Sequence, residues 1–363
     1  MPCRRDGAVG DRISIVVTTR NRPALLRSAL RSAHAQTWPD KEVIVVDEAS
    51  TEQTSILLAN EFPQTKVIRH DAPLGPSAAR NAGIAAARGD WVCFCDDDDL
   101  MHPEHLAQLL AAALAAPSHC LVSGRSRNFA VVGGNVVLGP AIWTPPDRPD
   151  TETLTEFLEP SALRTITHAT ILWPRKLFES ELWDEQLTFY EDFDLCSRAI
   201  LGGRHVIGRE TGMYYIRAHS GPRLTTGAHE QGLLSGARYR LKWSELLRAH
   251  PEHQGCAAAL RNGLMDSLIG LSGMGAGRQL MPRLEAAFRA WGGRRFYLVP
   301  PPRHWLKRAV AQSVVDVGGL PALRRLLAMV DALKPSGDGF VSTLRPAMTD
   351  GDKQDAAFIR ANQ

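Results

Sequence analysis

Four consecutive carboxylates, Asp96 to Asp99, directly follow the apolar run Trp91–Cys95. Like charges this close repel one another, so a chain rarely places them at the end of a buried strand without a cation. Carboxylate oxygens suit Mg²⁺ or Mn²⁺, which bridge proteins to phosphates. In open α/β sheets, the carboxyl ends of the strands are also where ligands bind. The run predicts a metal and phosphate site; the alternative is an acidic turn facing water.

Spacing within this run suggests which carboxylates act together. Asp96 and Asp98 lie two residues apart, so in extended backbone they share one face and could hold one metal ion, while Asp97 points elsewhere. Such an ion would offset negative charge on a leaving diphosphate. The register stays open, because Asp97 and Asp99 have the same spacing.

Two polar residues elsewhere could contact a nucleotide. Asp47 ends the apolar run 43–46 and could accept a hydrogen bond from a uracil N–H or bind a ribose hydroxyl; the alternative is a helix cap. Arg80 stands among small residues that allow close approach to a sheet, and its guanidinium offers a fork of donors. The alternative for Arg80 is a surface arginine.

Later in the chain, Glu191 and Asp192 open a predicted helix. The helix dipole favours carboxylates there, and a second interpretation is a general base that takes a proton from an acceptor hydroxyl. His219 follows the strand-like run 213–217 and could supply a neutral imidazole as a third metal ligand, or be structural.

Strands and helices alternate in the first third of the chain, which is typical of a doubly wound, mostly parallel α/β sheet. Strands are predicted at 13–17, 43–46, 67–68 and 91–95, and helices at 24–33, after 51, at 76–87 and at 103–116. Beyond residue 120 the patterns predict a hairpin over 130–137, a loop over 140–149, a strand over 166–173, a helix over 191–201 and helices from 229 onward.

These segments together resemble the inverting family 2 glycosyltransferases, which have the GT-A fold. The resemblance covers roughly residues 11–225 and rests on the order and spacing of its motifs. The motifs are Ile15–Arg22, Val43–Asp47, Gly75 with Ala79–Ile84, Gly89-Asp90, Phe94–Asp99, Glu191–Leu195 and Arg217–His219.

The resemblance implies a role for each matching position. The metal-binding DXD motif would be Asp96 and Asp98, with His219 as a late metal or diphosphate ligand, and Asp192 would be the base, with Glu191 beside it. The nucleotide would be bound by Thr18, Arg20, Asp47, Arg80, Asp96 and Asp97. One departure is Asp47-Glu48-Ala49-Ser50, where the family usually has Asp-Asp-Gly-Ser. Glu48 keeps the charge, but the loss of glycine could alter the loop and base recognition.

The implied reaction is a single displacement that inverts the anomeric carbon, with Mn²⁺ or Mg²⁺ stabilising the leaving nucleoside diphosphate. UDP is the expected carrier, with GDP and dTDP open, and the acceptor is a hydroxyl of a glycan, a lipid-linked glycan or a small molecule. Two alternatives remain: a degenerate sugar-nucleotide-binding protein without turnover, and a nucleotidyltransferase. The second is disfavoured because residues 18–23 contain no glycine.

Composition sets the remaining expectations. The chain has 363 residues, 44% hydrophobic and 22% charged, and its net charge of +3 is too small to argue for nucleic acid. Its six cysteines form no CxxC pair, which favours reduced thiols in a cytoplasmic protein. We expect neither a signal peptide nor a membrane span, because the N-terminus lacks an apolar core and no stretch of about 20 apolar residues occurs.

The predicted organisation has four parts: an N-terminal tail (1–11), a GT-A domain (12–225), a helical C-terminal region (226–334) and a flexible tail (335–363). The GT-A domain would divide into a nucleotide-binding half (12–124) and an acceptor-binding half (125–225). Aromatic and basic residues alternate between 289 and 308. They favour a helical lid or homodimer element with a core of aromatics; the alternative is peripheral contact with the inner face of the membrane.

Overall fold

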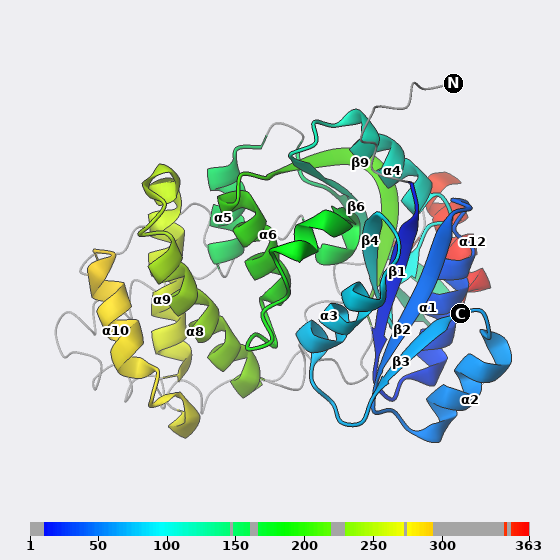
Figure 1. Cartoon of the computed structure of the whole chain (residues 1–363), viewed down its shortest axis with the longest axis horizontal. Helices are drawn as coiled ribbons and strands as arrows, with labels where there is room; N and C mark the ends of the chain where they lie inside the picture. The colour runs from blue at the N-terminus through cyan, green and yellow to red at the C-terminus, as the bar shows by residue number, and fades with distance from the viewer. Residues whose placement is uncertain are drawn as a thin grey trace.

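The computed structural model describes residues 11–145, 148–159, 166–218, 229–271, 274–292, 345–346 and 350–362. An α/β part built around a mixed sheet lies beside a group of helices formed by later residues (Figure 1). The doubly wound, mostly parallel sheet predicted for the first third of the chain is confirmed.

Four parallel strands form the first half of the sheet, in the order β3-β2-β1-β4. Their bounds are β1 (Ile13–Thr19), β2 (Lys41–Glu48), β3 (Lys66–His70) and β4 (Trp91–Asp96). Both faces of β1 are covered, since Ile13, Ile15 and Val17 belong to one core and Val16 to the other. Successive side chains of a strand point to opposite faces of the sheet. Helix α1 (Pro23–His34) covers the face of the first core, and α3 (Pro76–Ala86) covers the face of the second.

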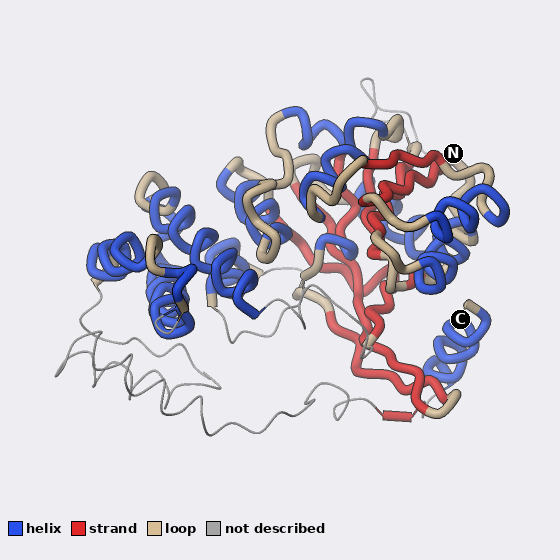
Figure 2. Tube along the Cα trace, turned by 90° about the horizontal axis from the view of Figure 1, so that it is seen from below, coloured by secondary structure: helices blue, strands red, loops and turns tan. Residues whose placement is uncertain are grey.

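A second group of strands extends the sheet past β4. The short β8 (Ile171–Pro174) pairs antiparallel with both β4 and β6. The remaining strands are β5 (Leu100–Met101), β6 (Cys120–Val132), β7 (Asn135–Ile142), β9 (His205–Arg217) and β10 (Arg345–Pro346). Figure 2 shows these strands continuing away from the parallel half, with the C-terminal helix beside their far end. Helices α2 (Glu52–Glu61) and α4 (His105–Ala115) complete this part.

Small residues bring α3 close to β1. A Cβ atom on Gly83 would lie 2.3 Å from Cγ1 of Val16, so only glycine allows this approach. Gly75, with φ of 99°, precedes the helix, and Pro76 occupies its first turn, where proline is favoured. The close approach places Arg80 of α3 at the sheet, as the small-residue stretch predicted.

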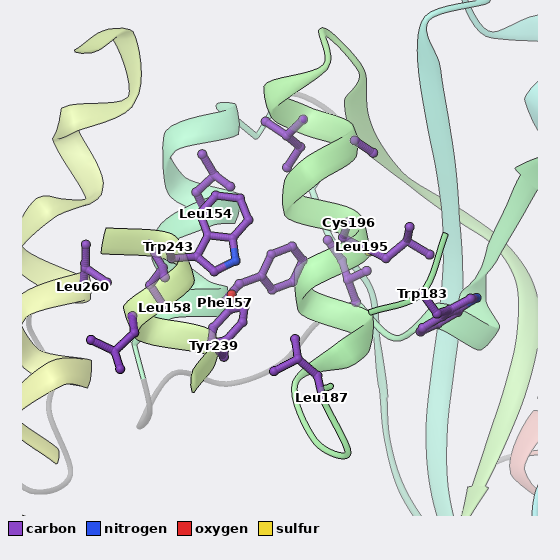
Figure 3. Close-up of a cluster of buried hydrophobic side chains, with 14 of the residues drawn as sticks. Leu154, Phe157, Leu158, Trp183, Leu187, Leu195, Cys196, Tyr239, Trp243 and Leu260 are labelled. Atoms are coloured by element: carbon purple, nitrogen blue, oxygen red, sulfur yellow. The ribbon is translucent and has the colours of Figure 1, made fainter. Parts of the chain in front are cut away.

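The second part is a helical group: α5 (Asp150–Leu158), α6 (Glu191–Leu201), α8 (His229–Leu246), α9 (Ala257–Leu271) and α10 (Met281–Ala290). Phe157 of α5, Leu195 of α6 and Trp243 of α8 converge in one buried apolar cluster (Figure 3). This cluster also contains Val16 and Phe94 of the sheet, so one core connects the two parts. Short 3-10 turns span His168–Thr170, Arg175–Glu179, Pro251–Cys256 and Gly275–Gly277.

Three expectations need correction. The strand predicted over 166–173 is confined to β8, because a 3-10 turn with a Thr167–Thr170 capping box precedes it. The loop predicted over 140–149 begins later, since β7 continues to Ile142. The tail is not flexible throughout, because α12 (Asp350–Ala361) buries Ala356 and Ile359 against β7 and β9 residues. These two positions lie three apart on one helix face, a pattern too short to stand out in a polar segment.

Arg127 of β6 forms ion pairs with Asp352 and Asp355 of α12, and the Tyr215 hydroxyl donates to Asp355 at 2.5 Å. All five cysteines within the described ranges are unpaired thiols, as expected. None of the described helices is long and apolar enough to cross a membrane.

Candidate active site

Strand register collects polar residues at one edge of the sheet. Thr18 lies opposite both Val46 of β2 and Asp96 of β4, and the next residue, Thr19, lies opposite Asp47. Thr18, Asp47 and Asp96 therefore lie at the carboxyl ends of three adjacent parallel strands, where ligands bind in such sheets. Arg20 follows β1 directly and its side chain is exposed.

Asp47 is only 1% exposed, and protein groups already hold it. Its Oδ1 accepts the Ser50 N–H at 3.0 Å, and its Oδ2 pairs with Arg69. The neighbouring Glu48, where the family has aspartate, accepts the N–H groups of Leu74 and Gly75 at 2.8 and 2.6 Å. The longer Glu48 side chain thus anchors the loop that leads into α3.

The missing glycine has a clear structural consequence. Ala49 has φ of 54°, a left-handed conformation that glycine adopts without strain. Adjacent Ser50 ties this loop to the end of β1, since its hydroxyl accepts the Asn21 N–H at 2.8 Å. The fold thus keeps the loop shape despite alanine, at a cost of roughly 1–2 kcal/mol.

We expect Ala49→Gly to stabilise the protein by about 0.5–1 kcal/mol, because relief of strain outweighs the added entropy of the unfolded chain. The free energy of unfolding in urea measures this change. Ala35→Gly is the matched control, since Ala35 is exposed with φ of −76° and should lose stability. Equal effects of the two substitutions would contradict strain at Ala49.

The acidic run forms a turn rather than an extended segment. Asp96 ends β4, and the Asp99 N–H donates to the Asp96 carbonyl at 3.2 Å. The expectation that Asp96 and Asp98 share one face of extended backbone is therefore wrong. Arg217 of β9 holds this turn, since its N–H donates to Asp99 at 2.8 Å and its Nε to the Asp98 carbonyl at 2.7 Å.

Asp97 points into the protein. It accepts hydrogen bonds from Thr19 Oγ1 at 2.6 Å and from Arg22 at 3.0 Å, and Arg22 also reaches Asp98 at 3.1 Å. Burial, with repulsion from Asp98, raises the pKa of Asp97 to about 7, although Arg22 and Thr19 oppose the shift. The predicted nucleotide contact of Asp97 stays a prediction, and its observed partners are the ends of β1 and the loop before α1.

Arg80 lies at the centre of the site and is only 5% exposed, so the surface alternative is wrong. Its guanidinium donates to Glu191 Oε1 at 2.9 Å and to Asp96 Oδ1 at 3.2 Å, and lies 4.6 Å from the centre of the Trp183 ring. The arginine predicted to bind a nucleoside thus joins the acidic turn to the start of α6.

Burial alone would raise the pKa of Asp96, but the charges of His168 and Arg80 outweigh it and hold that pKa well below its usual range. Burial raises the pKa of Glu191, with Asp192 adding to the shift and Arg80 opposing it. The site therefore depends on Arg80 for its charge balance.

Asp192 differs from its neighbour in its surroundings. The Glu191 side chain is 13% exposed and paired with Arg80, whereas the Asp192 side chain is 20% exposed. Asp192 accepts a hydrogen bond from the adjacent Phe193 N–H at 2.9 Å. Asp192 is thus the more exposed of the two carboxylates at the head of α6, and the one that Arg80 does not pair with.

The helical part of the chain supports α6. Tyr190, which precedes α6, has φ of 68° and stacks on Tyr239 of α8 at 5.4 Å. Asp194 is fully buried and accepts hydrogen bonds from Arg198 at 2.8 Å, Lys242 at 2.9 Å and Trp243 at 3.3 Å. Contacts from α8 therefore hold the segment that carries Glu191 and Asp192.

His168 was missed by the sequence reasoning. Its Nε2 lies 3.3 Å from Asp96 Oδ1 and 3.2 Å from Arg80, and its Nδ1 lies 3.9 Å from Asp192 Oδ2. Also missed were Thr19, Arg22, Trp183 and Arg217. The polar run after the first strand could have pointed to Thr19 and Arg22, but nothing local singles out His168.

The acidic turn is compatible with a divalent cation. Mg²⁺ and Mn²⁺ take oxygen ligands, which Asp96 and Asp98 supply, and the Asp96 side chain is 35% exposed. Within the described ranges, no three His, Cys, Asp or Glu side chains converge as a ready-made metal site. His219, the predicted third ligand, lies outside the described residues.

Comparison with known proteins finds a matching family. Residues 14–176 match the family model described as Glycosyl transferase family 2. This part of the chain is similar to glycosyltransferase family 2. The matched part contains the strand-end residues, the acidic turn and His168, while Glu191 and Asp192 follow it.

Curated relatives point to the same kind of protein. This chain is 31% identical to the succinoglycan biosynthesis protein ExoO of Rhizobium meliloti over 241 residues, which are 61% of this chain and 66% of the relative. It is 30% identical to the GalNAc(5)-diNAcBac-PP-undecaprenol beta-1,3-glucosyltransferase of Campylobacter jejuni over 131 residues. These residues are 35% of this chain and 38% of the relative. In both cases the chain spans less than two thirds of the relative's length.

A solved structure confirms the GT-A fold. S. aureus TarS 1–349 in complex with UDP-GlcNAc superposes with a TM-score of 0.57 at 17% identity, covering 94% of this chain and 97% of that one. At this identity the likeness concerns the fold.

Proposed function

We propose that this chain is a metal-dependent inverting glycosyltransferase that moves a sugar from a nucleoside diphosphate sugar, most simply a UDP-sugar, to an acceptor hydroxyl. The observation that carries the proposal is the contrast at the start of α6. Arg80 neutralises Glu191, while the Asp192 carboxylate, which is 20% exposed, forms no ion pair with arginine or lysine among the described residues and lies near the Asp96 end of the sheet. Such a carboxylate suits a general base.

Each residue then has a defined task. Thr18 and Arg20 bind the nucleoside at the end of β1, Asp47 exchanges its Arg69 contact for a nucleoside hydrogen bond at the end of β2, and Asp96 faces the diphosphate. Asp192 takes the proton from the acceptor hydroxyl as that oxygen attacks the anomeric carbon opposite the nucleotide. The bond to the diphosphate oxygen breaks in the same step, so the anomeric configuration inverts.

Asp96 and Asp98 would hold a Mn²⁺ or Mg²⁺ ion, with His219 as a third candidate ligand. Such an ion supplies positive charge that stabilises the leaving diphosphate. Arg22 and Arg217 hold the turn that carries the two carboxylates, so the pair is oriented before any ligand binds.

For the acceptor, we propose a hydroxyl of a growing, lipid-linked glycan in polysaccharide synthesis. ExoO is named for succinoglycan biosynthesis, and the Campylobacter relative is named for an undecaprenol-linked acceptor. UDP as carrier is supported by TarS, whose structure contains UDP-GlcNAc. A cytoplasmic location at the membrane's inner face would suit this acceptor.

Peripheral membrane contact through the C-terminal aromatic and basic residues, and a homodimer, remain predictions, because most of residues 289–308 lie outside the described ranges. Trp291 lies within them, and its Nε1 donates to the Ser244 carbonyl of α8 at 3.3 Å. This contact favours the interpretation in which the aromatics pack inside the helical region.

The decisive experiment incubates the protein and Mn²⁺ with UDP-glucose, UDP-galactose, UDP-N-acetylglucosamine, GDP-mannose or dTDP-glucose, with and without undecaprenyl-diphosphate-linked saccharides. We expect one donor to release its nucleoside diphosphate, with inversion at the transferred sugar seen by NMR. Thermal stabilisation by a nucleotide without turnover would instead indicate the degenerate binding protein. Release of pyrophosphate from a sugar phosphate and a nucleoside triphosphate would indicate a nucleotidyltransferase.

We expect removal of divalent cations with EDTA to lower turnover at least about 100-fold, because several kcal/mol of leaving-group stabilisation would be lost. Added Mn²⁺ should restore activity in the wild type but not in Asp98→Asn. Asp40→Asn is the matched control, since Asp40 is exposed at the opposite end of β2. Full activity in EDTA would refute metal dependence.

A further inference from the structure

His168 occupies a fixed position between the two halves of the site. It lies in the 3-10 turn before β8 and is 6% exposed. Its ring packs edge-on against Phe94 at 6.1 Å and Trp183 at 5.6 Å. These apolar neighbours leave the ring little freedom, so the directions of its two nitrogens are set by packing.

The two nitrogens face different carboxylates. Nε2 lies 3.3 Å from Asp96 Oδ1, and Nδ1 lies 3.9 Å from Asp192 Oδ2. Within the described residues, Nδ1 is a buried atom without a hydrogen-bond partner. A buried polar atom without a hydrogen-bond partner lowers the stability of the folded protein by roughly 1–3 kcal/mol. We therefore expect Nδ1 to acquire a partner in another state of the site.

We propose that His168 is a positioning residue that connects Asp96 to Asp192 and so sets the base at a defined distance from the donor-binding turn. The inference rests on the proposed function for the roles of these two carboxylates. The contact between Nδ1 and Asp192 shortens to a hydrogen bond when the substrates bind, as catalytic contacts in unliganded sites often do.

The physical reason is the geometry of a single displacement. Attack requires the acceptor oxygen, the anomeric carbon and the leaving oxygen to be aligned, so the base and the diphosphate site must be held at a fixed separation. Asp192 stands on α6 and Asp96 ends β4, so side-chain contacts between these two elements set the separation of the two carboxylates. Arg80 connects Asp96 to Glu191, whereas His168 connects it to Asp192 itself.

Two amide substitutions separate the two contacts. The amide of His168→Asn lies near the position of Nδ1 and can still reach Asp192, while the amide of His168→Gln lies near Nε2 and can still reach Asp96. We expect His168→Gln to lower kcat about tenfold or more with donor KM little changed. His168→Asn should instead raise donor KM and keep more of kcat, and His168→Ala should do both.

His34→Gln is the control, because His34 is a half-buried histidine whose Nε2 contacts Thr65 at the other end of the sheet. It should leave kcat and KM unchanged. Equal losses in the Asn and Gln variants, or normal kinetics in His168→Ala, would overturn the proposal.

A second measurement does not depend on turnover. In protein labelled with ¹⁵N-histidine, binding of UDP and Mn²⁺ should shift the Nδ1 resonance of His168, assigned from its absence in His168→Asn, in the wild type but not in Asp192→Asn. An unchanged resonance overturns the proposal even if the enzyme is active. A shifted resonance supports it even if no donor in the panel is turned over, so its failure is distinguishable from that of the proposed function.

Discussion

Asp192→Asn is expected to lower kcat for sugar transfer by about 10²–10⁴-fold while donor affinity stays within a few-fold of the wild type. The amide keeps the size and the hydrogen bond to the Phe193 N–H but cannot take a proton from the acceptor. Asp192 forms no ion pair with arginine or lysine among the described residues and its side chain is 20% exposed, so we expect the variant to fold. Kinetics at saturating donor, with calorimetric titration of UDP and Mn²⁺, separate turnover from binding.

Asp40→Asn serves as the control here too, since it changes an exposed carboxylate in the same way at the far end of the sheet. Glu191→Gln is the informative comparison, because Glu191 is tied to Arg80 and its loss should lower stability as well as activity. If Asp192→Asn keeps most of the wild-type kcat while Glu191→Gln does not, Glu191 is the base.

Arg80→Met is expected to lower the free energy of unfolding by about 3–5 kcal/mol and to abolish activity. Methionine fills the space beside Trp183 but leaves Asp96 and Glu191 without the cation that both contact. Arg80→Lys should also lose activity, because one ammonium cannot reproduce the fork that holds two carboxylates. Urea unfolding gives the stabilities, and nucleoside diphosphate release gives the activity.

The double variant Arg80→Met/Glu191→Gln tests the cause. Without Arg80, the carboxylates of Asp96 and Glu191 have lost their shared cation. Replacing one of them, Glu191, should then recover part of the lost stability, although Arg80→Met and Glu191→Gln are each destabilising alone. Arg31→Met is the control, since Arg31 is an exposed arginine with a single distant ion pair to Glu61 at 3.7 Å. Purely additive losses in the double variant would show that Arg80 acts through packing rather than charge.

The sequence by itself determined the parallel half of the fold and the edge where the site lies. Apolar β-branched runs such as 13–17 and 43–46 can be buried on both faces only in a covered sheet, so their order predicted the strands correctly. Polar residues that end such strands must gather at one edge, and this rule suffices to bring Thr18, Asp47 and Asp96 together.

Local sequence patterns could not predict the turn conformation of the acidic run or the helix near the end of the chain. The turn at Asp96–Asp99 depends on Arg22 and Arg217, which lie 76 and 119 residues away from Asp98 along the chain, so no local pattern predicts the contact. Likewise, α12 is a marginal helix alone and is stabilised by burying Ala356 and Ile359 on a distant part of the sheet.

Only the tertiary structure decided how the charges are paired. Arg80, Asp96, His168, Glu191 and Asp192 come from α3, β4, a 3-10 turn and α6, and they meet because β8 pairs antiparallel with β4 and α8 supports α6. A charge can be satisfied by any partner within reach, so residue type alone does not choose among them. Packing makes that choice, and it leaves Asp192 as the more exposed carboxylate beside a neutralised Glu191.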